Sequence, residues 1–133
     1  MATFKVQGGL KLKGDLHPQG AKNESLQVLC AVLLTPQEVI MENVPNIRDV
    51  NILIDLLRDL NVKVNQIDEE TYSFKADEVN IDYLSSEDYK AKSSRIRGSN
   101  MIVGPLLSRY GKGYIPRPGG DKIGRRRVDT HFI

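Results

Sequence analysis

The sequence has little of several features that mark particular classes of protein. Its 133 residues include one cysteine, Cys30, and no tryptophan, and only 6% are aromatic. A single cysteine excludes an internal disulfide framework, and no cluster of histidine, cysteine and carboxylate residues has metal-site spacing. The apolar run at residues 26–34 is too short to span a bilayer, and the N-terminus lacks the layout of a signal peptide. We therefore expect a soluble, cytoplasmic protein without a metal.

Excess charge of one sign is also absent. The formal net charge is +2, whereas general affinity for nucleic acid or a membrane surface needs a broad basic excess. The basic run at residues 125–127 is not interleaved with aromatic residues, so a small nucleic-acid binder is the weakest of the functions considered. The hydrophobic content of 40% is enough for the core of one modest domain. The basic run must therefore be a local feature.

The apolar periodicity predicts a mixed α/β chain. We expect strands at 3–7, 10–13, 38–44, 62–67 and 71–74 and from Tyr114, with helices at about 20–34, 46–60 and 94–109. The first helix is expected to be buried on most sides, and Val50, Leu53, Leu57 and Leu60 form one stripe of the second. Residues 77–88 fit an excursion, or an edge strand followed by a loop. In the third helix Gly98 and Gly104 indicate close approach to another backbone, and Pro105 indicates a kink or break.

A weak internal repeat has an offset of 75 residues. It aligns Lys22 with Arg97, residues 39–40 with 114–115, and residues 44–45 with 119–120. Both helices of the repeat then begin with a cation, which the positive end of a helix disfavours by about 0.3–1 kcal/mol. An anion bound between the two cations would explain this placement. The alternative, with equal weight, is that both side chains extend from an ordinary first turn into solvent.

The stretch 116–129 has the composition of an anion-binding loop. Five cations surround Asp121 in the sequence. The two glycines at 119–120 let the backbone approach a ligand closely. The glycine spacing matches neither the P-loop nor the dinucleotide-binding fingerprint. A solvated basic turn is the alternative, and the aligned Arg97 weighs against it.

Four motifs together resemble the UDP-N-acetylglucosamine 1-carboxyvinyltransferases of the enolpyruvyl transferase family. They are residues 20–23 (GAKN), 43–45 (NVP), Arg97 before 104–106 (GPL), and 118–124 (PGGDKIG) with 126–129. They follow the family's order along nearly the whole chain. The resemblance implies an inside-out α/β barrel of repeated β-α-β-α-β-β units, incomplete here, with residues 1–19 in a second domain and 20–133 in the substrate-binding domain.

The resemblance also implies a reaction. An enolpyruvyl group passes from phosphoenolpyruvate to the 3-hydroxyl of UDP-N-acetylglucosamine and phosphate leaves, in the first committed step of peptidoglycan synthesis, without a cofactor. Position by position, Lys22 and Asn23 would bind phosphoenolpyruvate and Asp121 would donate the proton. The UDP-sugar would be bound by Arg97, Arg126, Arg127, Val128, Asp129 and Thr130. The enzyme that acts on shikimate 3-phosphate is the nearest relative of another specificity.

Two residues depart from the usual family pattern. Many members have cysteine where this chain has Asp121, and proline where it has Arg127. A carboxyl group can also deliver a proton, but fosfomycin alkylates the thiol, so we expect resistance to fosfomycin. Arg127 in place of proline removes a constraint on φ and restores a backbone N–H.

Complete members of the family are much longer than 133 residues. We therefore expect the chain to correspond to about the first third of such an enzyme and to be inactive alone. The competing interpretation is a non-catalytic fragment that binds anions weakly or self-associates through exposed apolar surface.

Overall fold

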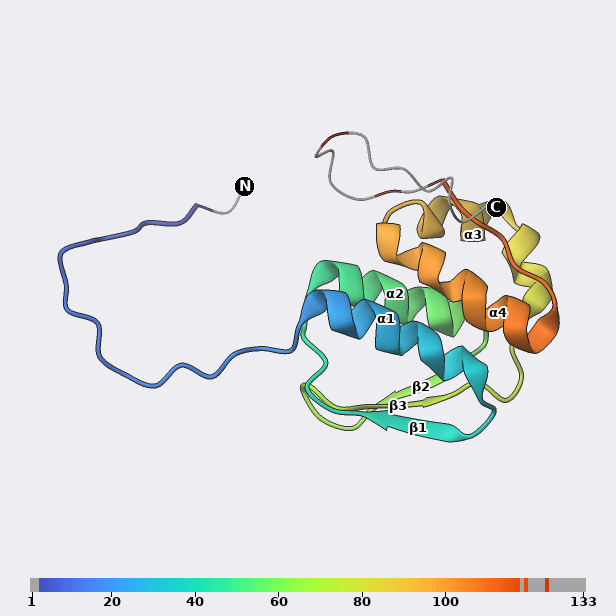
Figure 1. Ribbon diagram of the computed structural model, residues 1–133, viewed down its shortest axis with the longest axis horizontal. Coiled ribbons are helices and arrows are strands. Elements are labelled where there is room, and N and C mark those ends of the chain that lie inside the picture. Colours follow the sequence, from blue (N-terminus) through green and yellow to red (C-terminus); the bar gives the residue numbers. More distant parts are fainter. Residues whose placement is uncertain (1–2, 118, 120–123, 125–133) are drawn as a thin grey trace.

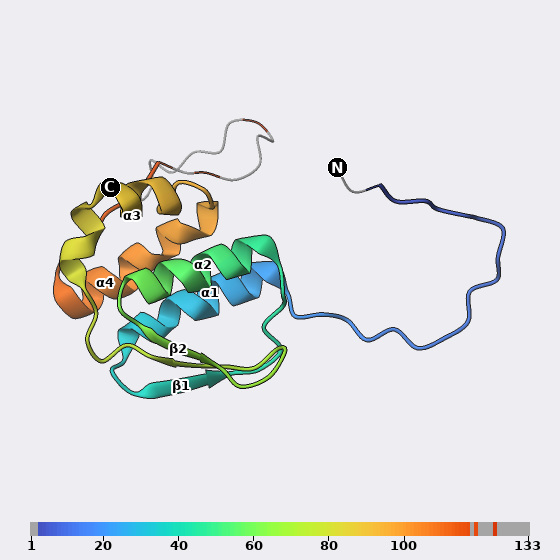
Figure 2. The same ribbon diagram turned by 180° about the vertical axis from the view of Figure 1, so that it is seen from behind.

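The computed structural model of the chain describes residues 3–117, 119 and 124, and its helices and strands form three layers. A three-stranded sheet lies on one side, and α1 (Lys22–Ala31) and α2 (Arg48–Asp59) form the middle layer (Figure 1). The third layer contains α3 (Glu87–Ser93) and α4 (Val103–Tyr110), and Figure 2 shows the same order from behind. The short 3-10 helices are η1 (Val32–Leu34), η2 (Ile81–Ser85) and η3 (Arg97–Ile102). The mixed α/β class is thus confirmed.

The sheet is antiparallel, with strands β1 (Glu38–Met41), β2 (Lys63–Gln66) and β3 (Tyr72–Lys75) in the order β1-β3-β2. In the central strand Phe74 lies opposite Val39 on one side and Val64 on the other, and it is fully buried. In the turn between β2 and β3 the side chain of Asp68 accepts hydrogen bonds from the backbone N–H groups of Glu70 and Thr71. These three strands were predicted; β1 and β2 are shorter than expected, and β3 is displaced by one residue.

The middle helices bury one face each. All four residues of the predicted α2 stripe are fully buried, which confirms that helix. In α1 and η1, Leu29 and Leu33 are fully buried, whereas Val28 is 45% and Leu34 is 52% exposed. The expected burial on most sides is therefore wrong, because in the part of the chain that is described the core lies along only one side of this helix.

The stretch 94–109 is two helical segments instead of one kinked helix. Pro105 is the third residue of α4, and a first-turn residue needs no acceptor for its N–H. η3 leads directly into α4, and the change from 3-10 helix to α-helix precedes the proline. Gly98 lies close to a side chain and not to a backbone as expected, since an added Cβ would lie 3.1 Å from Leu26 Cδ1, and around Gly104 there is open space. The sequence also missed α3, whose first turn is capped by Ser86.

Three predicted strands are absent. Residues 3–20 form no helix or strand and extend away from the layers (Figure 1), and residues 114–115 form no strand. In the first segment Phe4 is 91% and Leu12 is 96% exposed. Alternating patterns specify a strand only where a neighbouring strand can accept its hydrogen bonds, and an isolated hairpin is marginal in water. The described residues offer no such neighbour to these segments.

The buried Cys30 supplies a test of the packing around α1. Its thiol is 2% exposed and donates a hydrogen bond to the Leu26 carbonyl, and burial raises the pKa of the Cys30 thiol to about 12. Because the thiolate is the reactive form, we expect disulfide reagents at pH 8 to label the folded chain about 1,000-fold more slowly than the urea-unfolded chain. A Val28→Cys variant, on the exposed face of α1, should react at once. Equal rates in folded and unfolded chains would contradict this packing.

Candidate anion-binding site

The two cations that the 75-residue repeat aligns both begin helices. Lys22 is the first residue of α1 and Arg97 is the first residue of η3. Arg48, which the sequence analysis did not select, likewise begins α2. The first turns of α1 and α2 lie side by side at one end of the middle layer (Figure 1), where their partial positive charges add to those of the side chains. This end of the layer is suited to bind an anion.

Lys22 is held by a carboxylate. Its Nζ lies 3.1 Å from Oδ2 of Asp49, the second residue of α2, and the two side chains are 40% and 39% exposed. A pair this exposed contributes only about 0–1 kcal/mol to stability. Its importance is geometric, because it fixes where the ammonium group of Lys22 lies. Asn23 is the next residue of α1 and is exposed.

Arg97 is half-buried, on a firmly packed turn. The next residue, Gly98, packs against Leu26 of α1. Ser99 is fully buried, and its hydroxyl lies 2.6 Å from the Ser93 carbonyl and 2.8 Å from the Ile96 carbonyl. These contacts place the start of η3 beside the first half of α1. The anchoring role of Ser99 left no signal in the sequence, because serine is ordinary in a turn.

Two close contacts between backbone segments flank the candidate site. Each contains a glycine, and we call them glycine crossings. An added Cβ on Gly20 would overlap the carbonyl oxygen of Asn43, which has a left-handed φ of 56° just after β1. An added Cβ on Gly119 would overlap the carbonyl oxygen of Ser94, just before η3. At each crossing, the segment that precedes a helix contacts a segment that follows this helix later in the same repeat. The 75-residue offset relates these two crossings to within one residue, and helical segments begin at Lys22 and Arg97, although residues 114–115 form no strand.

The remaining predicted site residues lie outside the described residues. They are Asp121, Arg126, Arg127, Val128, Asp129 and Thr130. The neighbouring Arg117 is described and exposed, and Gly119 crosses the turn before η3. The described part of the loop therefore leads to the start of η3, where Arg97 lies.

A hollow beside the start of α1 does not resemble an anion site. It has a volume of about 310 Å³ between α1 and β1, and Glu24 and Glu42 contribute to its lining. Carboxylates there would repel phosphate, so the cations at the helix starts are the better candidates. Within residues 3–117, 119 and 124, no three histidine, cysteine, aspartate or glutamate side chains gather as metal ligands would. The same residues include no helix with the length and hydropathy needed to cross a membrane.

Comparison with known proteins relates nearly the whole chain to one family. The profile of EPSP synthase (3-phosphoshikimate 1-carboxyvinyltransferase) matches residues 6–132. A UDP-N-acetylglucosamine 1-carboxyvinyltransferase of Bacteroides fragilis is 55% identical over all 133 residues, and one of Porphyromonas gingivalis is also 55% identical. The chain spans 31% of the length of each of these two relatives.

A solved structure has the same fold. The enolpyruvyl transferase NikO from Streptomyces tendae matches with a TM-score of 0.65 and 25% identity, over 78% of this chain and 23% of its own. The match with the family profile extends from Val6 to Phe132 and so includes both helix starts and the basic loop. The chain therefore belongs to the EPSP synthase family of carboxyvinyltransferases.

Proposed function

We propose that this chain is part of an enzyme that transfers the enolpyruvyl group of phosphoenolpyruvate to the 3-hydroxyl of UDP-N-acetylglucosamine. The observation that carries the proposal is the 55% identity over the full chain with relatives that bear this enzyme's name. The reaction adds a proton to the methylene carbon of phosphoenolpyruvate while the sugar hydroxyl attacks the neighbouring carbon and loses its own proton to a base. Loss of a proton from the new methyl group and of phosphate then restores the double bond.

The positions of the described cations support the assigned roles. Lys22 and Asn23 at the positive end of α1 bind the phosphate and carboxylate of phosphoenolpyruvate. Arg97 at the start of η3, with Arg126 to Thr130, binds the UDP-sugar, and Asp121 donates the proton to carbon. Preorganised cations suit this chemistry because negative charge gathers on the departing phosphate.

The shikimate 3-phosphate enzyme is the second candidate, since the matching family profile carries its name. Both enzymes need the same clamp on phosphoenolpyruvate, so Lys22 does not distinguish them. The two differ in the acceptor, which the segment 126–130 would contact. The identity to UDP-sugar enzymes favours the nucleotide sugar.

The proposed architecture is an inside-out barrel in which sheets lie outside and helices inside. The outer face of the sheet supports it, because Glu38 and Lys63 flank Lys75 there and all three side chains are exposed. Residues 1–19 would join the sheet of a second domain and 20–133 would begin the substrate-binding domain. The exposed apolar side chains in the first segment fit this assignment, and without such a partner they would favour self-association.

A chimeric enzyme tests the proposal. In this chimera, residues 1–133 replace the matching 31% of the Bacteroides fragilis relative. Phosphate release is then measured with each acceptor. We expect turnover with UDP-N-acetylglucosamine, none with shikimate 3-phosphate, and none from the 133-residue chain alone. A Lys22→Ala chimera should lose about 100-fold or more in kcat/KM, since an anion clamp is removed. A folded chimera without activity, or one indifferent to Lys22→Ala, would refute the proposal.

A further inference from the structure

We propose that Asp49 is a positioning residue that holds the Lys22 ammonium group in place for phosphoenolpyruvate. The inference rests on the proposed function and adds a residue that neither the motifs nor the resemblance selected. Asp49 lies 27 positions after Lys22 in the chain, and the hydrogen bond between them joins the first turns of α1 and α2.

The ends of both helices favour this arrangement. The positive end of α1 repels the ammonium group of Lys22, so an unrestrained side chain would extend into water. The positive end of α2 stabilises the Asp49 carboxylate in its first turn. The carboxylate therefore restrains a cation that its own helix disfavours. An ammonium group has three donors, and one hydrogen bond to Asp49 leaves two for the anion.

Two opposing effects determine how much Asp49 changes the affinity for phosphoenolpyruvate. Restricting a free lysine side chain corresponds to about thirtyfold in affinity. A carboxylate about 6 Å from a bound anion in a water-exposed site weakens binding by about threefold. The restraint is the larger effect, so removing the Asp49 carboxylate is expected to weaken the binding of phosphoenolpyruvate by about tenfold.

The experiment uses the chimeric enzyme with the complete 133-residue segment and compares three variants with it. Asp49→Ala should raise the KM for phosphoenolpyruvate about tenfold and leave the KM for UDP-N-acetylglucosamine unchanged. Asp49→Asn keeps an acceptor in the same place, and its KM should stay within about threefold of the parent value. Asp55→Ala is the matched control, because Asp55 is also an α2 carboxylate in an ion pair, here with exposed Arg58. It should change neither KM.

A double-mutant cycle shows whether Asp49 acts through Lys22. The loss in Lys22→Ala should not grow when Asp49→Ala is added, because the restrained group is already absent. Additive losses, an unchanged KM in Asp49→Ala, or equal defects in Asp49→Ala and Asp49→Asn would overturn the inference. Thermal unfolding of the 133-residue variants monitors folding, and a general loss of structure would lower kcat without selecting one substrate. An inactive parent chimera would refute the proposed function and this inference together, whereas an active one with a normal Asp49→Ala variant would refute only the inference.

Discussion

Replacing Asp121 by asparagine is expected to abolish enolpyruvyl transfer in the chimeric enzyme while both substrates still bind. Asparagine has nearly the same shape but no proton to give to the methylene carbon. Removing a general acid costs about 100- to 10,000-fold in rate, and here the donor starts the reaction. Stopped-flow or rapid-quench measurement of phosphate release gives the rate, and calorimetry gives the affinity for the UDP-sugar. Undiminished turnover would reject Asp121 as the donor.

The cations near Asp121 in the sequence oppose the protonation that a proton donor needs. The rate of the reaction should therefore depend on pH. Lys122 and the arginines at 125–127 are close in sequence, and nearby cations stabilise the carboxylate and oppose its protonation. Bound phosphoenolpyruvate brings phosphate and carboxylate charges that offset these cations. We therefore expect substrate-assisted protonation, with kcat falling as the pH rises through the pKa of Asp121 in the complex. The pKa of a carboxyl group can be raised to values between roughly 5 and 9. A kcat that is independent of pH over this range would contradict substrate-assisted protonation.

Asp121→Cys is the matched variant. A thiol can also deliver a proton, so this variant should retain turnover, and it should acquire the target that fosfomycin alkylates. The parent chimera is expected to resist fosfomycin, whereas Asp121→Cys should be inactivated progressively with time. Mass spectrometry should find the adduct on residue 121 alone. Covalent, time-dependent inactivation of the parent would contradict the resistance.

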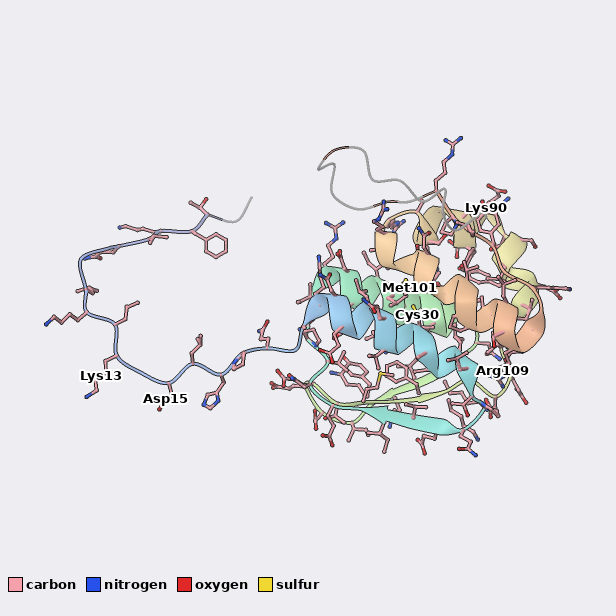
Figure 3. All side chains as sticks on the ribbon, in the orientation of Figure 1. Lys13, Asp15, Cys30, Lys90, Met101 and Arg109 are labelled. Atoms are coloured by element: carbon pink, nitrogen blue, oxygen red, sulfur yellow. The ribbon has the colours of Figure 1, made fainter. Side chains whose placement is uncertain are left out.

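Replacing Arg109 by alanine is expected to destabilise the 133-residue chain by about 2–4 kcal/mol. Arg109 lies near the C-terminal end of α4 (Figure 3), and its Nη1 donates to the carbonyls of Leu33 at 3.2 Å and Ala76 at 2.6 Å. One side chain thus joins the third layer to the end of η1 and to the residue after β3. Alanine would leave both carbonyls without this charged donor. Urea unfolding should report the loss, and the melting temperature should fall by about 10 °C.

Two variants separate this contribution from ordinary surface charge. Arg109→Lys keeps the charge and the N–H donors, but its side chain is shorter and its nitrogen does not extend as far as Nη1, so it should lose an intermediate amount. Arg58→Ala removes an arginine from an exposed ion pair on α2 and should cost less than about 0.5 kcal/mol. Equal effects of Arg109→Ala and Arg58→Ala would show that the carbonyl contacts contribute nothing.

The sequence predicted the parts of the fold in which local pattern and tertiary packing agree. The α2 stripe is an example, since each of its four leucine and valine positions is fully buried. The strands expected at 3–7 and 10–13 have an equally clear alternation, but a strand also needs a partner that its own residues do not encode. Pro105 was misread for a different reason, because its meaning depends on whether it lies in the first turn or later.

The candidate site was predictable where motifs carried it. Lys22 and Arg97 begin helices as the repeat indicated, and the motifs selected Asn23. Asp49 was missed because its importance depends on a contact with a residue 27 positions earlier. Ser99 was missed because a buried hydroxyl and an exposed one look the same in sequence. The binding and catalytic roles of Lys22, Asn23 and Arg97 stay predictions, as do those of residues 121 and 126–130.

The two glycine crossings suggest how a duplicated unit diverges. At one crossing the glycine belongs to the chain entering the helix, Gly20, and at the other it belongs to the returning segment, Gly119. The steric requirement is thus inherited by the contact and can be met from either side. After a gene duplication, either copy can lose the glycine on one side of the contact if it gains one on the other side. The identity between aligned positions of the two halves then decays, while the geometry of the contact persists. Covariation between the two sides of such contacts would detect ancient duplications that comparison of single positions overlooks.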